Sequence, residues 1–346
     1  MTLATIDQKS FDDLRQFFET ETSISLGDDK RYLIETRLKP ILKNEGCHSW
    51  GDLLVKSKND RSHRIRDQIL DAMTTNETLW FRDEGPFTAL RDKLLPRFAD
   101  EIRSGKRDKI RIWSSACSTG QEPYSVMITA LEFIRTQTAI KPEHIEILAS
   151  DISDTALAEA KSGSYNSVAM SRGLAPEVRN RYFVENGRNW EVKPELRERI
   201  TFRKFNLQDS FSLLGKFDII LNRYVSIYFS DEFKRGLYRK LHNSLEAKGH
   251  LFLGASESLD GYSDEFVTFR HGRAIYYQAM NQGANETLTR NLDLMRSQPN
   301  SLPKVETKSA AAVPPAATTA RPEKKDPTDL SDVLAMLKEM NTKFDT

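Results

Sequence analysis

The feature that most constrains the fold is an alternation of short apolar segments with segments of helical periodicity, which begins near residue 110. Helical patterns lie at about 123–136, 153–162 and 231–247. The apolar segments around them read KIRIWSS, IEILASDIS, FDIILNRY and GHLFLGAS. Because parallel strands need long crossover connections, this alternation predicts an α/β domain with a parallel, doubly wound sheet.

Two departures from this alternation predict additional β-structure. The run FVTFRHGRAIYYQ carries two β-rich segments around a His-Gly turn, so we expect a hairpin that adds an antiparallel strand at the edge of the sheet. Between the second and third repeats, at about 164–204, an Asn-Gly turn separates 182–184 from 190–192. We expect a short β-ribbon here, within a small inserted β-subdomain at about 178–204.

The other segments differ in composition from the α/β domain, which we place at 91–281. Residues 1–90 show apolar positions at helical spacing and no convincing strand, so a small all-α domain is expected. The segment 282–327 is polar and becomes rich in Pro, Ala, Thr and Lys, which is typical of a disordered linker. Residues 328–346 predict a short amphipathic helix, which is either a marginal helix without a partner or one that docks on an unidentified partner.

The composition argues against several classes of protein. Lys plus Arg (51) nearly balances Asp plus Glu (50), so no overall positive field indicates a nucleic-acid partner. The two cysteines and six histidines show no metal-ligand spacing, and no bound metal is expected. No apolar run approaches the roughly 20 residues that span a bilayer, and the N-terminus has no export signal. We therefore expect a cytoplasmic protein that does not insert into the membrane.

The turn that follows the first apolar segment, in WSSACSTGQEPYS, limits the ligand. Its glycine, Gly120, is preceded by small residues that include Ala116. The turn lacks both the GxGxxG pattern that admits a pyrophosphate and the GxxxxGK[ST] pattern that holds a triphosphate. Glu122 would repel a phosphate but can pair with a cation. The turn therefore favours a ligand with an ammonium group, and the amino-acid part of S-adenosylmethionine meets this requirement.

Later segments support a nucleoside ligand. Asp151 ends the second apolar segment, where a carboxylate can accept hydrogen bonds from both hydroxyls of a ribose, although it could also be the N-cap of the next helix. Further on, Asn206 and Leu207 combine an amide with an apolar side chain, which suits an adenine. In this order, along a sheet that ends in a hairpin, these residues favour a nucleoside methyl donor over NAD or ATP.

Longer runs of the sequence resemble a known family. They are DAMTTNETLWFRDEGPF (71–87), IRIWSSACSTGQEPYSVM, ASDIS, RGL, FNLQDSF, FDIILNRYVSIYF and LFLGASESL. In this order they are similar to CheR-type chemoreceptor glutamate methyltransferases over about residues 10–280. The resemblance implies a Rossmann-like S-adenosylmethionine-dependent methyltransferase fold with an antiparallel last strand, a small inserted β-subdomain and an all-α N-terminal domain. It also implies methyl transfer, without a metal, to glutamates on the cytoplasmic helices of chemoreceptors, with S-adenosylhomocysteine as product.

The resemblance also implies roles for individual residues. Arg82 and Tyr228 are the expected catalytic residues, because a guanidinium and a phenol can guide and orient the acceptor carboxylate. Arg37, Lys39 and Lys43 lie within about two turns of a predicted helix and are expected to contact the receptor. The residues expected to bind the methyl donor are Asn76, Thr78, Arg82, Ala116, Glu122, Asp151, Asn206, Leu207, Arg223 and Tyr224.

The pattern alone leaves alternatives open for these residues. Arg82 could form a surface salt bridge with Asp83 or Glu84, and Tyr228 could be a core aromatic at the end of a strand. The basic residues of the N-terminal domain could belong to ordinary solvated helix faces. The turn of the inserted ribbon is short and lacks Gly-x-Gly-Pro, so we expect that no tether peptide of the receptor is needed.

One motif departs from the family's usual pattern. The family usually has Arg-Asn-Val-Leu-Ile-Tyr-Phe where this chain has RYVSIYF, so Tyr224 replaces an Asn and Ser226 replaces a Leu. A phenol at this position is expected to weaken donor binding, to reshape the pocket or to mark a changed activity. The competing hypothesis is therefore a catalytically weak scaffold that binds receptors. A nucleic-acid methyltransferase is disfavoured, because the sequence has no Asn/Asp-Pro-Pro-Tyr-type motif for flipped bases.

Overall fold

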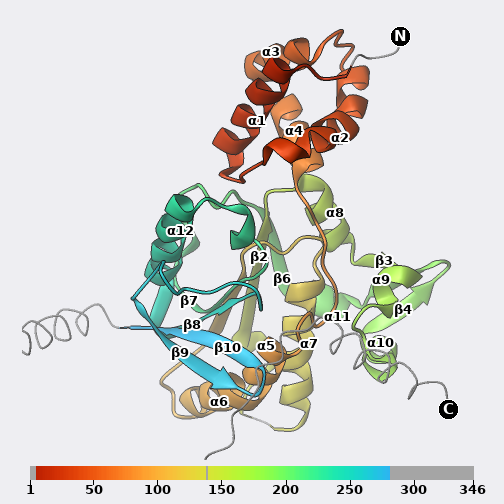
Figure 1. Ribbon diagram of the computed structural model, residues 1–346. Coiled ribbons are helices and arrows are strands. Elements are labelled where there is room, and N and C mark those ends of the chain that lie inside the picture. The colour runs from red at the N-terminus through yellow and green to blue at the C-terminus, as the bar shows by residue number, and fades with distance from the viewer. Residues whose placement is uncertain (1–4, 138, 281–346) are drawn as a thin grey trace, which may run out of the picture. The chain divides into compact units, whose positions relative to one another are not determined.

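The computed structural model describes residues 5–137 and 139–280 (Figure 1). They belong to one compact unit. The predicted linker at 282–327 and the predicted terminal helix at 328–346 lie outside the described residues. The limits proposed for the N-terminal domain and for the α/β domain stay predictions.

The N-terminal region is helical, as the apolar spacing predicts. Its core is formed by side chains that include Phe11, Leu38 and Leu53, each nearly inaccessible to solvent. The capping box of Ser49 and Asp52 fixes where the third helix begins, because each side chain accepts a hydrogen bond from the other's backbone. The helices are α1 (Gln8–Thr22), η1 (Asp28–Lys30), α2 (Arg31–Asn44), α3 (Trp50–Asn59) and α4 (Arg64–Met73).

The main sheet has seven strands in the order β6-β2-β1-β7-β8-β10-β9. The first five of these pair in parallel, and β10 pairs antiparallel with β8 and with β9. The predicted parallel sheet with an antiparallel hairpin at its edge is therefore confirmed. The strands are β1 (Ile110–Ser114), β2 (Ile145–Asp151), β6 (Ile200–Lys204), β7 (Phe217–Asn222), β8 (Leu245–Leu253), β9 (Phe266–His271) and β10 (Ala274–Ala279).

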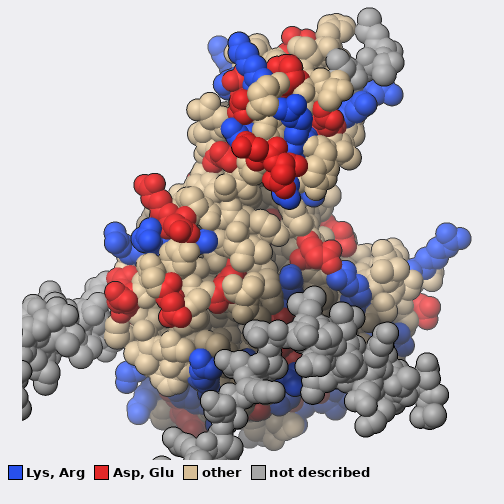
Figure 2. All heavy atoms as spheres, viewed as in Figure 1, with Lys and Arg blue, Asp and Glu red and all other residues tan. Residues whose placement is uncertain are grey.

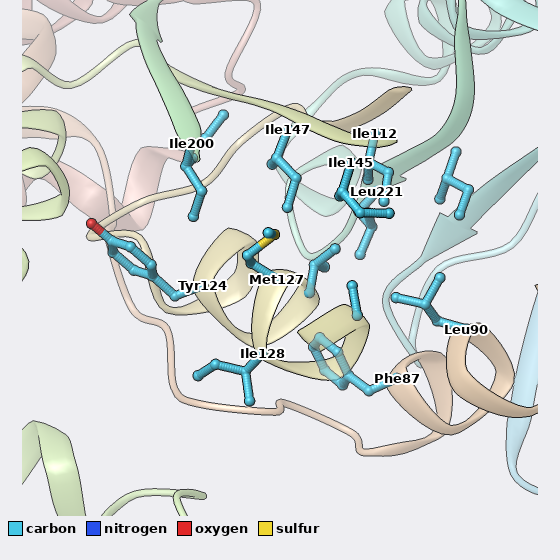
Figure 3. Packing of buried hydrophobic residues seen from close by; sticks show 14 of the residues in the cluster. Phe87, Leu90, Ile112, Tyr124, Met127, Ile128, Ile145, Ile147, Ile200 and Leu221 are labelled. Atoms are coloured by element: carbon cyan, nitrogen blue, oxygen red, sulfur yellow. The ribbon is translucent and has the colours of Figure 1, made fainter. Parts of the chain in front are cut away.

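Helices cover both faces of this sheet, because successive strand residues point to opposite sides. Ile112 and Leu221 pack in one layer with Met127 and Phe87, as Figure 3 shows, whereas Trp113 packs in the other layer with side chains of α12. The helices around the sheet are α5 (Gly85–Ala89), η2 (Leu90–Leu94), α6 (Leu95–Arg103), α7 (Gln121–Arg135), η3 (Pro142–His144), α8 (Asp154–Ser162), η4 (Ser212–Leu214), η5 (Ser226–Tyr228) and α12 (Asp231–Asn243).

The insertion forms a second, three-stranded sheet in the order β3-β5-β4. The predicted ribbon corresponds to β4 (Phe183–Asn186) and β5 (Asn189–Val192), which pair antiparallel around the Asn-Gly turn. The sequence did not predict β3 (Ser164–Asn166), which completes this sheet. The short helices α9 (Ser167–Ser171), α10 (Pro176–Tyr182) and α11 (Pro194–Arg197) flank the strands.

One expected boundary needs correction at the end of the insertion. The predicted subdomain, at about 178–204, included residues 200–204, but these form β6 and pair with β2 in the main sheet. Only Ile200 of this edge strand is buried, so its sequence does not read as an apolar strand. The predicted helix at 231–247 is also shorter, since α12 ends at Asn243 and β8 begins at Leu245.

Candidate functional site

A pocket lies at the carboxyl edge of the main sheet, where the turns after β1, β2, β6 and β7 meet the segment 73–79. The empty space inside it, including its open mouth, is about 1030 Å³. All of the residues expected to bind the donor line this pocket, and so does Tyr228. Ligands of open α/β sheets bind at this edge, because the strand ends and their loops leave a crevice there. Arg37, Lys39 and Lys43 do not line the pocket.

The turn after β1 owes its shape to residues in the left-handed region. Ser118 has φ 50° and Gly120 has φ 95°. A Cβ atom on Gly120 would lie 2.8 Å from the Cβ atom of Ala160 and 3.0 Å from the hydroxyl oxygen of Tyr165. The turn therefore requires glycine at this position, both for its conformation and for the close approach of α8.

Asp151 ends β2 and is 7% exposed. Its carboxylate accepts hydrogen bonds from the backbone N–H of Ser118 at 2.7 Å and of Ser153 at 3.0 Å. Burial raises the pKa of Asp151, although these hydrogen bonds oppose the rise. The N-cap of α8 is Ser153, whose hydroxyl accepts from the N–H of Ala156. Asp151 therefore has no capping role and keeps acceptor capacity toward the pocket.

Glu122, in the first turn of α7, is held from both sides. The hydroxyl of Ser114 donates to its Oε1 at 2.7 Å, and Nη1 of Arg223 donates to its Oε2 at 2.8 Å. The Arg223 side chain is 1% exposed and also pairs with Asp83 at 2.7 Å. A buried guanidinium needs such partners, because an unpaired charge would be costly to desolvate. Two acids, Glu122 in the pocket wall and Asp83 beside it, thus surround one arginine.

Arg82 does not form the salt bridge that its neighbours in the sequence suggest. Its guanidinium lies over the ring of Tyr224, 3.5 Å from the ring centroid, and Nη1 donates to the carbonyl of Glu77 at 3.2 Å. Asp83 pairs instead with Arg223, and it accepts a hydrogen bond from the Tyr224 hydroxyl at 2.6 Å. Burial and this hydrogen bond raise the pKa of Tyr224. Tyr224 therefore joins the segment at 82–83 to the loop after β7.

The loop after β6 and the segment before Arg82 also carry polar contacts. The amide nitrogen of Asn206 donates to the carbonyl of Glu21 at 2.8 Å, and Leu207 is buried. The amide nitrogen of Asn76 donates to the hydroxyl of Ser153 at 3.2 Å. Thr78 lines the pocket.

Tyr228 is not a core aromatic. It is 37% exposed at the pocket, while the next residue, Phe229, is 6% exposed and belongs to the core. The backbone carbonyl of Tyr228 accepts from the N–H of Ser25 at 2.8 Å, which holds this part of the loop in place. Its hydroxyl-bearing ring is thus available to a molecule that enters the pocket.

Comparison with known proteins identifies the family. Residues 76–275 match the family model described as "CheR methyltransferase, SAM binding domain", and residues 9–74 match "CheR methyltransferase, all-alpha domain". The chain belongs to the CheR methyltransferase family. Its α/β domain is thus a CheR S-adenosylmethionine-binding domain.

Curated relatives align along nearly their whole length. Chemotaxis protein methyltransferase Cher2 of Pseudomonas putida is 43% identical over 270 residues, which cover 78% of this chain and 97% of the relative. Chemotaxis protein methyltransferase 1 of Pseudomonas aeruginosa is 42% identical and covers 81% and 100%, respectively. The chemotaxis protein methyltransferase of Vibrio parahaemolyticus is 43% identical and covers 80% and 99%.

The three basic residues expected to contact a receptor differ from one another in this CheR protein. Nη1 of Arg37 donates to the backbone carbonyls of Met73 at 2.9 Å and Thr74 at 3.0 Å. Lys39 and Lys43 are exposed, and neither has an ion pair within the described part of the chain. Figure 2 shows basic side chains together with acidic ones on the visible face of the helical region. Arg37 therefore stabilises the end of α4, and the two lysines remain free to meet a partner.

Sequence reasoning missed two acids beside the CheR pocket, Asp83 and Glu257. Both act through partners that are distant in the sequence, since Asp83 bonds Arg223 and Tyr224 while Glu257 bonds the loop after β7. The signal that could have indicated Glu257 is a carboxylate four residues after the end of a buried strand, as in LFLGASESL.

Within residues 5–137 and 139–280, no group of three or more His, Cys, Asp or Glu side chains could hold a metal ion. No helix among the described residues is both long and apolar enough to cross a membrane.

Proposed function

We propose that this protein transfers methyl groups from S-adenosylmethionine to glutamate side chains of chemoreceptors, which yields γ-glutamyl methyl esters and S-adenosylhomocysteine. The observation that supports this most directly is the pocket at the carboxyl edge of a CheR-family sheet, where all the residues matched to the donor site lie together. The relatives named above are chemotaxis protein methyltransferases. We further propose that the reaction belongs to chemotaxis adaptation and takes place in the cytoplasm.

The residues present suit this donor. Each carboxylate can accept about four hydrogen bonds. Asp151 accepts two from backbone N–H groups, which leaves capacity for the two hydroxyls of a ribose. Glu122 would pair with the ammonium group of the donor. The same carboxylate also pairs with Arg223. Asn206 and Leu207 would lie beside the adenine.

The reaction requires the protein mainly to position the methyl donor and the acceptor. The bound donor supplies an activated methyl group on a positively charged sulfur. A glutamate acceptor is ionised at pH 7, so no general base is required, and orientation should contribute most of the rate enhancement. Arg82 can guide the acceptor carboxylate by charge, and the hydroxyl of Tyr228, a partly exposed residue of the pocket, can orient it by a hydrogen bond. No residue of this site calls for a metal.

The acceptor surface is proposed to include Lys39 and Lys43, since both are exposed on α2. Their positive charge suits the acidic cytoplasmic helices of chemoreceptors. The proposal assigns no role to nucleic acid or to membrane insertion.

The test is methylation of receptor-containing bacterial membranes with methyl-labelled S-adenosylmethionine, followed by mild base. Esters release labelled methanol, whereas N-methyl and S-methyl products do not. Asp151→Asn should weaken S-adenosylhomocysteine binding roughly 10- to 100-fold and abolish most of the labelling, because a charged hydrogen-bond acceptor is lost. Asp209→Asn, an exposed change just beyond the pocket, is the matched control and should behave as the unchanged chain.

Titration calorimetry separates this proposal from the scaffold hypothesis. Micromolar binding of S-adenosylhomocysteine by the unchanged chain, together with base-labile label on receptors, supports the enzyme. The other outcome is that the unchanged chain does not bind S-adenosylhomocysteine and Tyr224→Asn restores binding. The phenol would then close the pocket, and the protein would be a receptor-binding scaffold.

A further inference from the structure

Glu257, just beyond the end of β8, binds the loop that follows β7 with both of its carboxylate oxygens. Oε2 accepts from the N–H of Tyr224 at 2.6 Å and from the N–H of Gly254 at 2.7 Å. Oε1 accepts from the hydroxyl of Ser226 at 2.6 Å, and from the N–H groups of Val225 at 3.1 Å and Ile227 at 3.3 Å. One side chain thus satisfies donors from four consecutive residues, 224–227, and from Gly254.

The shape of the loop depends on this anion. Tyr224 has φ 57°, a left-handed conformation that a bulky non-glycine residue rarely adopts. A turn of this kind directs successive N–H groups to one point and forms an anion-binding nest. Glu257 forms no ion pair within the described residues, so the backbone amides and the Ser226 hydroxyl are its direct partners. Without the carboxylate, these donors would face each other unsatisfied.

The loop held by Glu257 builds one wall of the pocket. Arg223, Tyr224, Val225 and Tyr228 line the pocket, while Glu257 itself does not. The effect of Glu257 on the reacting groups must therefore be indirect.

Tyr224 extends this hold to the segment at 82–83. Its ring packs closely on Gly254, since a Cβ atom there would lie 3.0 Å from two ring carbons. Its hydroxyl donates to Asp83, and Arg82 lies over its ring. A shift of the Tyr224 backbone would thus move Arg82 as well as Tyr228. This chain of contacts joins Glu257 to both expected catalytic residues.

We infer that Glu257 is a positioning residue, which fixes the loop 224–228 and thereby places Tyr228 and, through Tyr224, Arg82 at the mouth of the pocket. The hold on the loop is a property of the fold. Its consequence for turnover rests on the function proposed above.

Glu257→Gln is a sharp test, because it keeps the size of the side chain but replaces one acceptor oxygen by an NH₂ group that faces two or three donors. Amide hydrogen exchange at residues 224, 225 and 227 should accelerate at least about tenfold, while exchange in β1 and β7 stays unchanged. With receptor as acceptor, kcat should fall about 100-fold, as expected for a misplacement of about 1 Å. KM for the receptor should change less than about threefold, because the proposed receptor contacts Lys39 and Lys43 lie outside the pocket lining.

Two further variants complete the test. Glu246→Gln, an exposed glutamate in β8 with no side-chain hydrogen bond within the described residues, should leave exchange and kcat unchanged. Glu257→Asp keeps the charge but shortens the side chain, so it should reproduce the local acceleration of exchange. If either Glu257→Gln or Glu257→Asp showed the loop exchange and the kcat of the unchanged chain, the inference would be overturned. Uniform acceleration of exchange through the core would overturn it too, because the role would then be general stability.

The exchange measurement also separates this inference from the proposed function. If the unchanged chain methylates no receptor, the proposed function fails. Local loss of protection in Glu257→Gln would still show that Glu257 holds the loop, and its absence would refute that hold.

Discussion

At the scale of single residues, Tyr224 is the most informative side chain of the site. It occupies a left-handed position, which Asn tolerates better than an aromatic residue does. The Arg82 guanidinium lies over the Tyr224 ring, and the Tyr224 hydroxyl donates a hydrogen bond to Asp83. Tyr224, which replaces the family's usual Asn, therefore contacts both Arg82 and Asp83, and an Asn could not make both contacts. We interpret Tyr224 as a clamp between the segment at 82–83 and the loop after β7.

Tyr224→Phe tests the polar half of this clamp. The variant keeps the ring under Arg82 but removes the bond to Asp83, so we expect a loss of about 0.5–1.5 kcal/mol in the free energy of unfolding. S-Adenosylhomocysteine affinity should change less than about threefold, because Arg223 still holds Asp83. Urea unfolding and calorimetry measure the two quantities. A large loss of affinity with unchanged stability would show that the hydroxyl contacts the ligand instead.

At the scale of elements, the turn from β1 into α7 depends on Gly120. Gly120→Ala places a methyl group at φ 95° and 2.8 Å from Ala160, so we expect a loss of about 2–4 kcal/mol in the free energy of unfolding and weaker donor binding. The control is Gly187→Ala in the β4–β5 turn, where φ is 63° and no atom lies within 4 Å of the added carbon. That variant should lose only about 1 kcal/mol. Equal losses in denaturant unfolding would contradict the packing argument.

The contact of α2 with the end of α4 gives another prediction for elements. Arg37→Met keeps the aliphatic stem but removes the bonds to the carbonyls of Met73 and Thr74, so about 1–3 kcal/mol of stability should be lost. Donor affinity should fall too, because Met73 and Thr74 belong to the segment 73–79 that lines the pocket.

Lys39→Met is the matched control on the same helix. It should leave stability and donor affinity unchanged and reduce only receptor methylation, since Lys39 is exposed. If Arg37→Met kept full stability and lost only methylation, Arg37 would be a receptor contact after all.

How far the sequence predicted these elements depended on burial. The strands β1, β2, β7 and β8 are buried along much of their length, so their apolar runs were recognisable. The edge strand β6 exposes most of its side chains and was assigned to the insertion. Glu122, Asp151 and Asn206 followed from strand ends, whereas Asn76, Thr78 and Arg82 came only from the family resemblance. The bonds of Asp83 and Glu257 depend on contacts that no local pattern encodes.

At the scale of the whole molecule, His250 links stability to pH. It is 2% exposed in β8, and burial together with the nearby charge of Arg97 lowers its pKa from 6.5 to about 3. Below pH 6.5 the unfolded chain takes up a proton at this residue, while the native protein excludes it. Stability should therefore decrease as the pH falls from 6.5 toward 3, by at most about 1.4 kcal/mol per pH unit.

His250→Phe removes this proton uptake and keeps an aromatic ring beside Tyr276. Relative to the unchanged chain, the variant should gain roughly 2–3 kcal/mol between pH 6.5 and 4.5, whatever its stability at pH 7. Urea unfolding at half-unit pH intervals measures the difference, with His48→Gln as an exposed control that should run parallel to the unchanged chain. If the stability of His250→Phe and of the unchanged chain changed with pH in parallel, the native protein would take up the proton at His250. The sheet would then open locally around β8 and β10 in acid, since His250 lies where these strands pair.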